Sequence, residues 1–156
     1  MGIPLLAFYL STNWYQLMLI QGNSMAPSYK HLQMVLLNRH SRDYTYGDVV
    51  AFYSDELSCV LVKRIAACPG DTAVIKNRTL YVNDKVSEVF PQGFSFQYAG
   101  VLSQQAMLEP ESYLVLGDNI SESKDSRYPE VGFVSDGKII GKINGAETTA
   151  KLLSVR

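Results

Sequence analysis

Short stretches in which apolar and polar residues alternate dominate this chain. Alternation with a period of two is typical of strands that bury one face, and turn residues separate the stretches. No window of ten or more residues has a convincing helical period. Many short strands with regular turns favour an all-β fold, a compact barrel or sandwich of mostly antiparallel strands with few or no long helices. The strands are predicted over residues 33–39, 49–53, 58–67, 72–75, 79–82, 113–116, 132–134 and 138–143.

Residues 90–111 break this regularity. They are weakly patterned and contain Pro91, Gly93, Gly100 and Pro110, residue types that interrupt strands and helices. We therefore expect a small excursion from the core in this segment.

Composition favours a single packed domain. Of the 156 residues, 47% are hydrophobic and 19% are charged, so a core is possible and wholesale disorder is not expected. The net charge of −1 gives no electrostatic case for nucleic acid as a partner or for an anionic membrane surface. No glycine-rich nucleotide motif or metal-ligand spacing is present, so neither a cofactor nor a metal is predicted. Cys59 and Cys68 could form one bridge in an oxidising compartment, but two buried free thiols are the simpler interpretation.

The first 29 residues contain no charged side chain. An apolar run at residues 3–10 (IPLLAFYL) is too short to span a bilayer and lacks the basic start and the cleavage site of a secretory signal. Trp14 and Tyr15 follow it, and both residue types are enriched at membrane interfaces. These residues alone leave two interpretations open: a buried first strand, or the outer end of a membrane anchor whose upstream part is missing.

Ser24, in the stretch QGNSMAPSY, is a candidate nucleophile at a bend. A serine hydroxyl needs a base, and a lysine amine serves only when it is neutral, which requires an apolar environment that lowers its pKa. Lys63 fits this requirement because alternation along its strand places three apolar residues on its face, namely Cys59, Leu61 and Ile65. The alternatives are an ordinary surface turn at Ser24 and a lysine that snorkels to water from a strand edge.

Polar residues gather in the segment 117–127 (GDNISESKDSR), between two predicted strands. Glycine, aspartate, asparagine and serine are ordinary turn residues, so this segment by itself indicates no more than a long solvated turn. His31 and His40 lie in a polar stretch away from the other candidates, and solvated loop positions explain them more simply than catalysis does. A histidine base for Ser24 is therefore not expected.

Four segments, in this order, resemble the type I signal peptidases, in the compact form typical of Gram-positive bacteria. GNSMAPS (22–28) resembles the nucleophile box Ser-Met-x-Pro, and GDVVAF (47–52) resembles the next box. VKRIAACPGD (62–71) resembles the box that carries the general-base lysine, and GDNISESKDSR (117–127) resembles the closing box. Each segment alone is a weak signal, but four of them in the family's order are specific.

The resemblance implies a hydrolase, a signal peptidase I with a serine–lysine dyad, and a role for each matching residue. Ser24 would attack the scissile carbonyl, Lys63 would be the general base, and Ser123 would hydrogen-bond the lysine amine and orient it. Asp125 and Arg127 would form a buried ion pair that supports the loop. The oxyanion hole would use the backbone N–H of Ser24.

The sequence departs from the family pattern at several positions. Gly22 stands where some members supply a second oxyanion donor from a hydroxyl side chain, and Asn23 stands where a small or acidic residue is common. Ile120 replaces the arginine that relatives usually carry. None of these changes removes a residue of the implied dyad.

The implied substrates are exported precursor proteins that carry signal peptides. An extended segment would pair with the strands that flank Ser24 and Lys63, and Ile20, Met25 and Val62 would line its pockets, unless these three are ordinary core packing. The implied location is the cell membrane, with the catalytic domain on the extracytoplasmic face and lipid against an exposed N-terminal apolar surface. The chain would then divide into a juxtamembrane segment, 1–20, and a single catalytic β domain, 21–156.

Three other functions compete with this interpretation. A self-cleaving repressor-type peptidase would usually carry a DNA-binding segment or a self-cleavage loop, and neither is recognisable. A signal-peptidase-like chaperone or assembly factor for surface polymers would bind extended peptides without cutting them, and a specialised peptidase would process the subunits of such polymers. Loss of the dyad would mark the chaperone, and both Ser24 and Lys63 are present.

Overall fold

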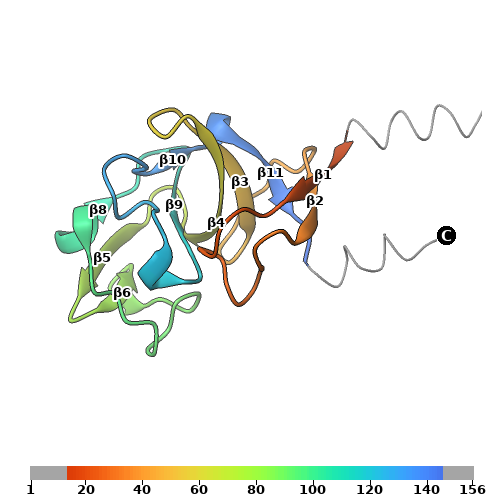
Figure 1. Cartoon of the computed structure of the whole chain (residues 1–156). Helices are drawn as coiled ribbons and strands as arrows, with labels where there is room; N and C mark the ends of the chain where they lie inside the picture. Colours follow the sequence, from red (N-terminus) through yellow and green to blue (C-terminus); the bar gives the residue numbers. More distant parts are fainter. Residues whose placement is uncertain (1–13, 146–156) are drawn as a thin grey trace, which may run out of the picture.

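The computed structural model describes residues 14–145, which form two antiparallel sheets in a sandwich-like arrangement (Figure 1). The larger sheet has the order β1 (Tyr15–Leu19), β2 (Met34–Asn38), β11 (Ile139–Ile143), β3 (Val49–Ser54), β4 (Cys59–Ala67), β9 (Ser112–Leu116), β10 (Val134–Ser135). The smaller sheet has the order β7 (Lys85–Val86), β6 (Thr79–Val82), β5 (Thr72–Lys76), β8 (Ala106–Met107). Three one-turn 3-10 helices complete the described elements: η1 (Gly100–Ser103), η2 (Ile120–Glu122), η3 (Asp136–Lys138).

The predicted all-β fold is confirmed, and most predicted strands lie within one or two residues of the observed ones. Neither sheet closes into a barrel, so the sandwich is the correct form of the prediction. The hairpin of β5 and β6 turns at Asn77 and Arg78, which both have positive φ values of 49° and 63°. The last predicted strand before β11 is displaced, because β10 covers Val134–Ser135 rather than residues 132–134.

Strand β3 is buried on both faces and forms the centre of the larger sheet. Val49 and Ala51 point to one hydrophobic cluster, while Val50 and Phe52 point to another on the opposite face. This strand pairs with β4 along its whole length, with Val50 opposite Lys63. The neighbour strand that carries Lys63 is therefore fixed against a rigid central element.

The segment 90–111 has little regular structure, as expected, but it is not separate from the core. Phe90, Phe96, Leu102 and Leu108 are at most 2% exposed and pack in one cluster with the smaller sheet and β9. Their spacing fits neither a strand nor a helix, so periodicity could not reveal that they are buried. The predicted excursion therefore closes one side of the smaller sheet.

Strand β1 is an edge strand with an apolar face that remains in solvent. We call the exposed apolar residues on β1, at the start of β2 and just before each of these strands the β1 patch; its members are Trp14, Tyr15, Leu17, Leu19, Leu32 and Met34. The expected exposed surface at residues 3–20 is thus present in its described part, except that Ile20 is buried, while residues 3–13 lie outside the described range. Among residues 14–145 no helix is long and apolar enough to cross a membrane.

Candidate active site

Ser24 lies on the turn that joins β1 to β2, and packing on one side fixes this turn. Gly22 has a φ of +84°, which favours glycine, and its N–H donates to Nδ1 of His31 at 2.9 Å. Met25 and Tyr29 are buried in the cluster beneath the larger sheet, and the Tyr29 N–H donates to the Met25 carbonyl at 2.9 Å. His31 is exposed, as expected, but it is not remote from the site, because it accepts this hydrogen bond two residues before Ser24.

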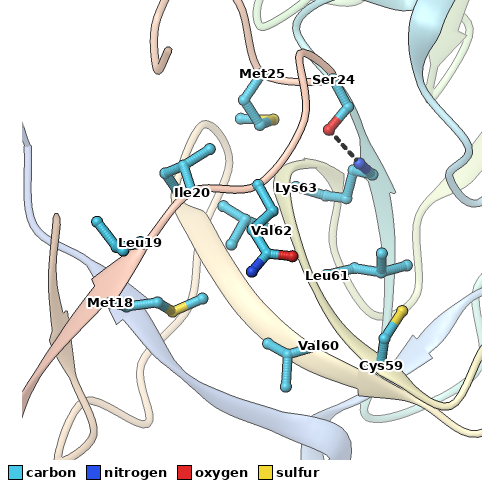
Figure 2. A pocket seen from close by; sticks show the side chains of 11 residues that line it. Met18, Leu19, Ile20, Ser24, Met25, Cys59, Val60, Leu61, Val62 and Lys63 are labelled. Carbon is cyan, nitrogen blue, oxygen red and sulfur yellow. Dashed lines mark hydrogen bonds between the residues drawn. The ribbon is translucent and has the colours of Figure 1, made fainter. Parts of the chain in front are cut away.

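Ser24 and Lys63, which are 39 residues apart in the chain, meet at the surface of the larger sheet. The Lys63 Nζ donates to the Ser24 Oγ at 2.7 Å (Figure 2). Lys63 is only 2% exposed, and this burial lowers its pKa from 10.5 to about 8, against the attraction of the Asp125 charge. An amine with such a pKa is neutral in a substantial fraction of molecules just above neutral pH and can accept the proton of the neighbouring hydroxyl.

The environment of Lys63 differs from the expected apolar strand face. Ile65 is fully buried and Leu61 is half-buried, but Cys59 is exposed. The strand face that carries Lys63 is therefore covered at Ile65 and open to solvent at Cys59.

Ser123 lies in the predicted region, but its predicted hydrogen bond to the Lys63 amine is absent. Its Oγ is buried and has no hydrogen-bond partner among the described residues. The hydroxyl packs against the backbone of Gly117, where an added Cβ would lie 2.1 Å from Ser123 Oγ and 2.6 Å from the Ser24 carbonyl oxygen. Only glycine allows this approach at residue 117, so the loop, the turn of Ser24 and Ser123 are in close contact there.

Asp125 and Arg127 form a buried ion pair, with 2.8 Å between Asp125 Oδ1 and Arg127 Nε. The second carboxylate oxygen of Asp125 accepts from the Gly117 N–H at 3.1 Å. The Arg127 guanidinium also donates to the carbonyls of Ile120 and Ser123, at 2.9 and 3.1 Å. The pair therefore shapes the loop 117–127 from inside, and its charges are well provided with hydrogen bonds.

A second ion pair joins this loop to β4. Arg64 donates from Nε and Nη2 to the two carboxylate oxygens of Asp118, at 2.7 and 2.6 Å, and from Nη1 to the Gly47 carbonyl at 2.8 Å. This bidentate pair follows Lys63 directly in sequence. It had no sequence signal beyond the polar character of the loop, because ordinary solvent-facing options also suit an arginine on that face.

A cavity of about 280 Å³ extends from Ser24 and Lys63 along the space between β1 and β4. Figure 2 shows Met18 and Ile20 on the β1 side, Leu61 and Cys59 on the β4 side, and Ser24 with Lys63 at one end. The lining residues are Met18, Leu19, Ile20, Gln21, Ser24, Met25, Cys59, Val60, Leu61, Val62 and Lys63.

The three residues predicted for a substrate pocket, Ile20, Met25 and Val62, all lie in this lining. Ile20 and Met25 are also buried members of a core cluster, and Val62 packs against it, so pocket lining and core packing are both true of them. Leu61 and Met18 were missed, although alternation from Lys63 and from Ile20 points to them.

The walls of this cavity include two stretches of backbone that are unpaired on one side. β1 pairs only with β2, and the pairing of β4 with β9 begins at Arg64, so within residues 14–145 the segment 59–63 pairs with β3 alone. Free backbone N–H and C=O groups on facing strands are suited to an extended peptide, which adds to a sheet through main-chain hydrogen bonds.

Cys59 and Cys68 are both free, the first exposed and the second half-buried, so a disulfide between them is not formed. Within the described residues no three histidine, cysteine, aspartate or glutamate side chains are grouped as metal ligands.

Comparisons with known proteins agree with one another. The family model described as "Signal peptidase, peptidase S26" matches residues 1–146. The chain is 33% identical over 148 residues to signal peptidase I U of Bacillus subtilis (strain 168), covering 89% of this chain and 79% of that protein. It is 32% identical over 143 residues to signal peptidase IB of Staphylococcus aureus (strain Mu50 / ATCC 700699), covering 80% and 73%. A crystal structure of a signal peptidase I from Enterococcus faecalis V583 is similar with a TM-score of 0.51 and 25% identity, over 65% of this chain and 97% of that one.

Proposed function

The chain belongs to the signal peptidase family, peptidase S26, and from this premise we propose that it is a membrane-associated serine endopeptidase that removes signal peptides from exported precursors. Ser24 is the nucleophile and Lys63 the general base of this proposal. The observation that carries it is the 2.7 Å contact between Ser24 Oγ and the buried Lys63 amine, whose pKa is lowered to about 8.

The reaction proceeds in two halves. Ser24 Oγ attacks the scissile carbonyl while its proton passes to the neutral Lys63 amine, and the resulting oxyanion accepts a hydrogen bond from the Ser24 N–H. The carbon–nitrogen bond then breaks, Lys63 gives its proton to the leaving amine, and an acyl ester remains on Ser24. Water then gives a proton to the same amine and attacks the ester carbonyl. The bond between the acyl carbon and Ser24 Oγ breaks, Oγ takes the proton back from Lys63, and the signal peptide leaves with a free carboxylate.

Supporting roles follow from the contacts of the loop 117–127. Asp125 and Arg127 hold the loop in shape, and Asp118 ties it to β4 beside Lys63. Ser123, buried next to Gly117, keeps this part of the loop in close contact with the turn that carries Ser24. The extended substrate adds its backbone between β1 and β4, with small side chains in the part of the cavity lined by Ile20, Met25 and Val62.

Cleavage of an exported precursor tests the proposal directly. Ser24→Ala and Lys63→Ala should abolish cleavage without unfolding the protein, and Lys63→Arg should also fail because a guanidinium stays charged. Lys76→Ala, on the exposed end of β5, is the matched control and should cleave normally. Precursor that stays uncut by the wild type but is bound would favour the chaperone, and cleavage by either alanine variant would end the dyad assignment.

The dependence of kcat/KM on pH gives a second test. Because only the neutral amine accepts the proton, activity should rise with pH through a midpoint near 8, the pKa to which burial lowers Lys63. A midpoint above 10, the range of an exposed lysine, would contradict a buried base. The same profile measured with Lys76→Ala should be superimposable.

The β1 patch supports the membrane part of the proposal. Leu17 and Leu19 are about half exposed on one face of β1, and a contiguous apolar face of this kind is favourable against lipid. Leu17→Ser with Leu19→Ser should weaken co-sedimentation of the full chain with phosphatidylcholine vesicles, whereas Met107→Ser, at a 71% exposed position on β8, should not. Equal loss in both variants, or no loss in either, would count against lipid contact through this patch.

A further inference from the structure

Asn119 connects two segments that are distant in sequence, the loop 117–127 and the turn that carries Ser24. Its backbone N–H donates to the Ser24 carbonyl at 2.9 Å. Its side-chain Nδ2 donates to the Asn23 carbonyl at 3.2 Å, across 96 residues of chain. One residue thus donates hydrogen bonds to two successive backbone carbonyls, that of Ser24 and that of the residue before it.

The side-chain contact acts on the peptide unit that matters for the oxyanion. The Asn23 carbonyl and the Ser24 N–H belong to the same planar peptide group, so fixing the direction of the C=O also fixes the direction of the N–H. Among residues 14–145 the Ser24 N–H donates to no hydrogen bond, and it is therefore available to a ligand. A donor on the Asn23 carbonyl also polarises this peptide group and strengthens the N–H as a donor.

A further contact selects the orientation of the Asn119 amide. Ser121 Oγ lies 3.1 Å from Asn119 Oδ1 and donates to it, so Nδ2 is the end that faces the Asn23 carbonyl. The Asn23 carbonyl has one more partner, the Ala26 N–H at 3.1 Å, which comes from the turn itself. The turn alone supplies one restraint on the peptide plane, and Asn119 supplies the second from a separate segment.

We propose that Asn119 is a positioning residue that holds the Asn23–Ser24 peptide group so that its N–H serves as the oxyanion donor. This inference rests on the proposed function, in which the Ser24 N–H stabilises the oxyanion. Asn119 touches neither the dyad amine nor the substrate side chains in this role. It acts only on the orientation of the Asn23–Ser24 peptide group. Its effect on the reaction is therefore limited to the step in which negative charge develops on the oxygen of the scissile carbonyl.

The kinetic signature follows from that confinement. Removing one oxyanion donor typically costs about 10²- to 10³-fold in kcat. Asn119→Ala retains the donor but loosens its direction, so we expect kcat to fall by roughly 10- to 100-fold with KM nearly unchanged. The pH midpoint set by Lys63 should not move, because its contact with Ser24 Oγ is separate. Ser121→Ala removes only the hydrogen bond that orients the Asn119 side-chain amide, so it should lower kcat by less than Asn119→Ala does.

The experiment compares Asn119→Ala, Ser121→Ala and a matched control, Glu122→Ala. The Glu122 side chain is exposed on η2, the 3-10 helix that Asn119 caps, and makes no hydrogen bond or ion pair with any of residues 14–145. A peptide aldehyde whose carbonyl is attacked by Ser24 forms a tetrahedral adduct with an oxyanion, and the corresponding peptide alcohol cannot. Aldehyde affinity should fall in Asn119→Ala by about the same factor as kcat, whereas alcohol affinity should stay constant. Glu122→Ala should match the wild type in every measurement.

Two outcomes would overturn the inference. One is an unchanged kcat in Asn119→Ala while Ser24→Ala and Lys63→Ala are inactive, which would leave the proposed function standing. The other is a joint change of kcat, KM, pH midpoint and melting temperature, which would assign Asn119 a general structural role. If Ser24→Ala itself still cleaves, the proposed function fails instead, and the two failures are therefore distinguishable.

Discussion

The buried amine of Lys63 predicts a pH dependence of folding stability that one substitution removes. The folded protein lowers the pKa of Lys63 from 10.5 to about 8, and unfolding restores the ordinary value. Below pH 8 both states carry the proton, and the folded state bears the full desolvation penalty of the ammonium. Between pH 8 and 10.5 the unfolded state binds a proton that the folded state does not, so the free energy of unfolding rises with pH.

The magnitude follows from that interval. At ~1.36 kcal/mol per pH unit, a pKa lowered from 10.5 to about 8 corresponds to about 3 kcal/mol. Lys63→Met keeps most of the chain length and removes the titrating group. The free energy of unfolding of Lys63→Met should therefore exceed that of the wild type by the largest amount at and below pH 8. By pH 10.5 this difference should have decreased by about 3 kcal/mol.

Urea unfolding followed by circular dichroism, on both proteins from pH 6 to 10.5, measures this quantity. Other titrating groups, such as Tyr29 and Tyr113, whose pKa values burial raises, contribute to both proteins and cancel in the difference. Lys76→Met supplies the control, because its exposed side chain leaves little desolvation to remove. A difference between Lys63→Met and wild type that does not change with pH would refute the reasoning.

Two further predictions concern the supports of the site. Asp125→Asn should lower the free energy of unfolding by about 3–5 kcal/mol in urea titrations, because it leaves the Arg127 charge buried and uncompensated, whereas a loss under 1 kcal/mol would show that the pair is dispensable. Gly117→Ala would place a Cβ 2.1 Å from Ser123 Oγ, so the loop must move, and precursor cleavage should fall on the order of 100-fold with much less change in melting temperature; full activity would mean that the contact relaxes freely.

The sequence predicted the strands well because short apolar or alternating stretches between turn residues mark them locally. Val49 to Phe52 and the β5–β6 hairpin follow from local pattern and turn chemistry alone. For the segment 90–111 the irregular structure was predicted but the burial was not. Phe90 and Leu108 are buried although their positions in the sequence follow no strand or helix period. Burial without periodicity requires knowledge of which segments meet, which one sequence does not contain.

In the candidate site too, the features that follow from local sequence were predicted, and those that depend on contacts between distant segments were not. The pairing of Ser24 with Lys63 was predicted because each residue type demands a specific environment in the proposed role, and four ordered boxes placed both residues in one family pattern. The grip of Asn119 on the Asn23 carbonyl was not found, because a side-chain amide in a polar loop looks like any turn residue until its partner across the fold is known. The exposure of Cys59 was misjudged for a related reason: alternation states which side a residue is on, but not where the covering layer ends.

The position of Arg127 has a consequence for how the protein opens. Its guanidinium donates to the Tyr98 carbonyl as well as to the loop 117–127, and its own carbonyl accepts from the Val101 N–H at 2.9 Å. The segment 90–111 and the loop 117–127 are thus both hydrogen-bonded to Arg127, and neither can unfold locally without exposing its guanidinium charge. Protected amides in both segments should therefore show similar opening free energies in hydrogen exchange, and proteolytic cleavage of one segment should also lower the protection of the other.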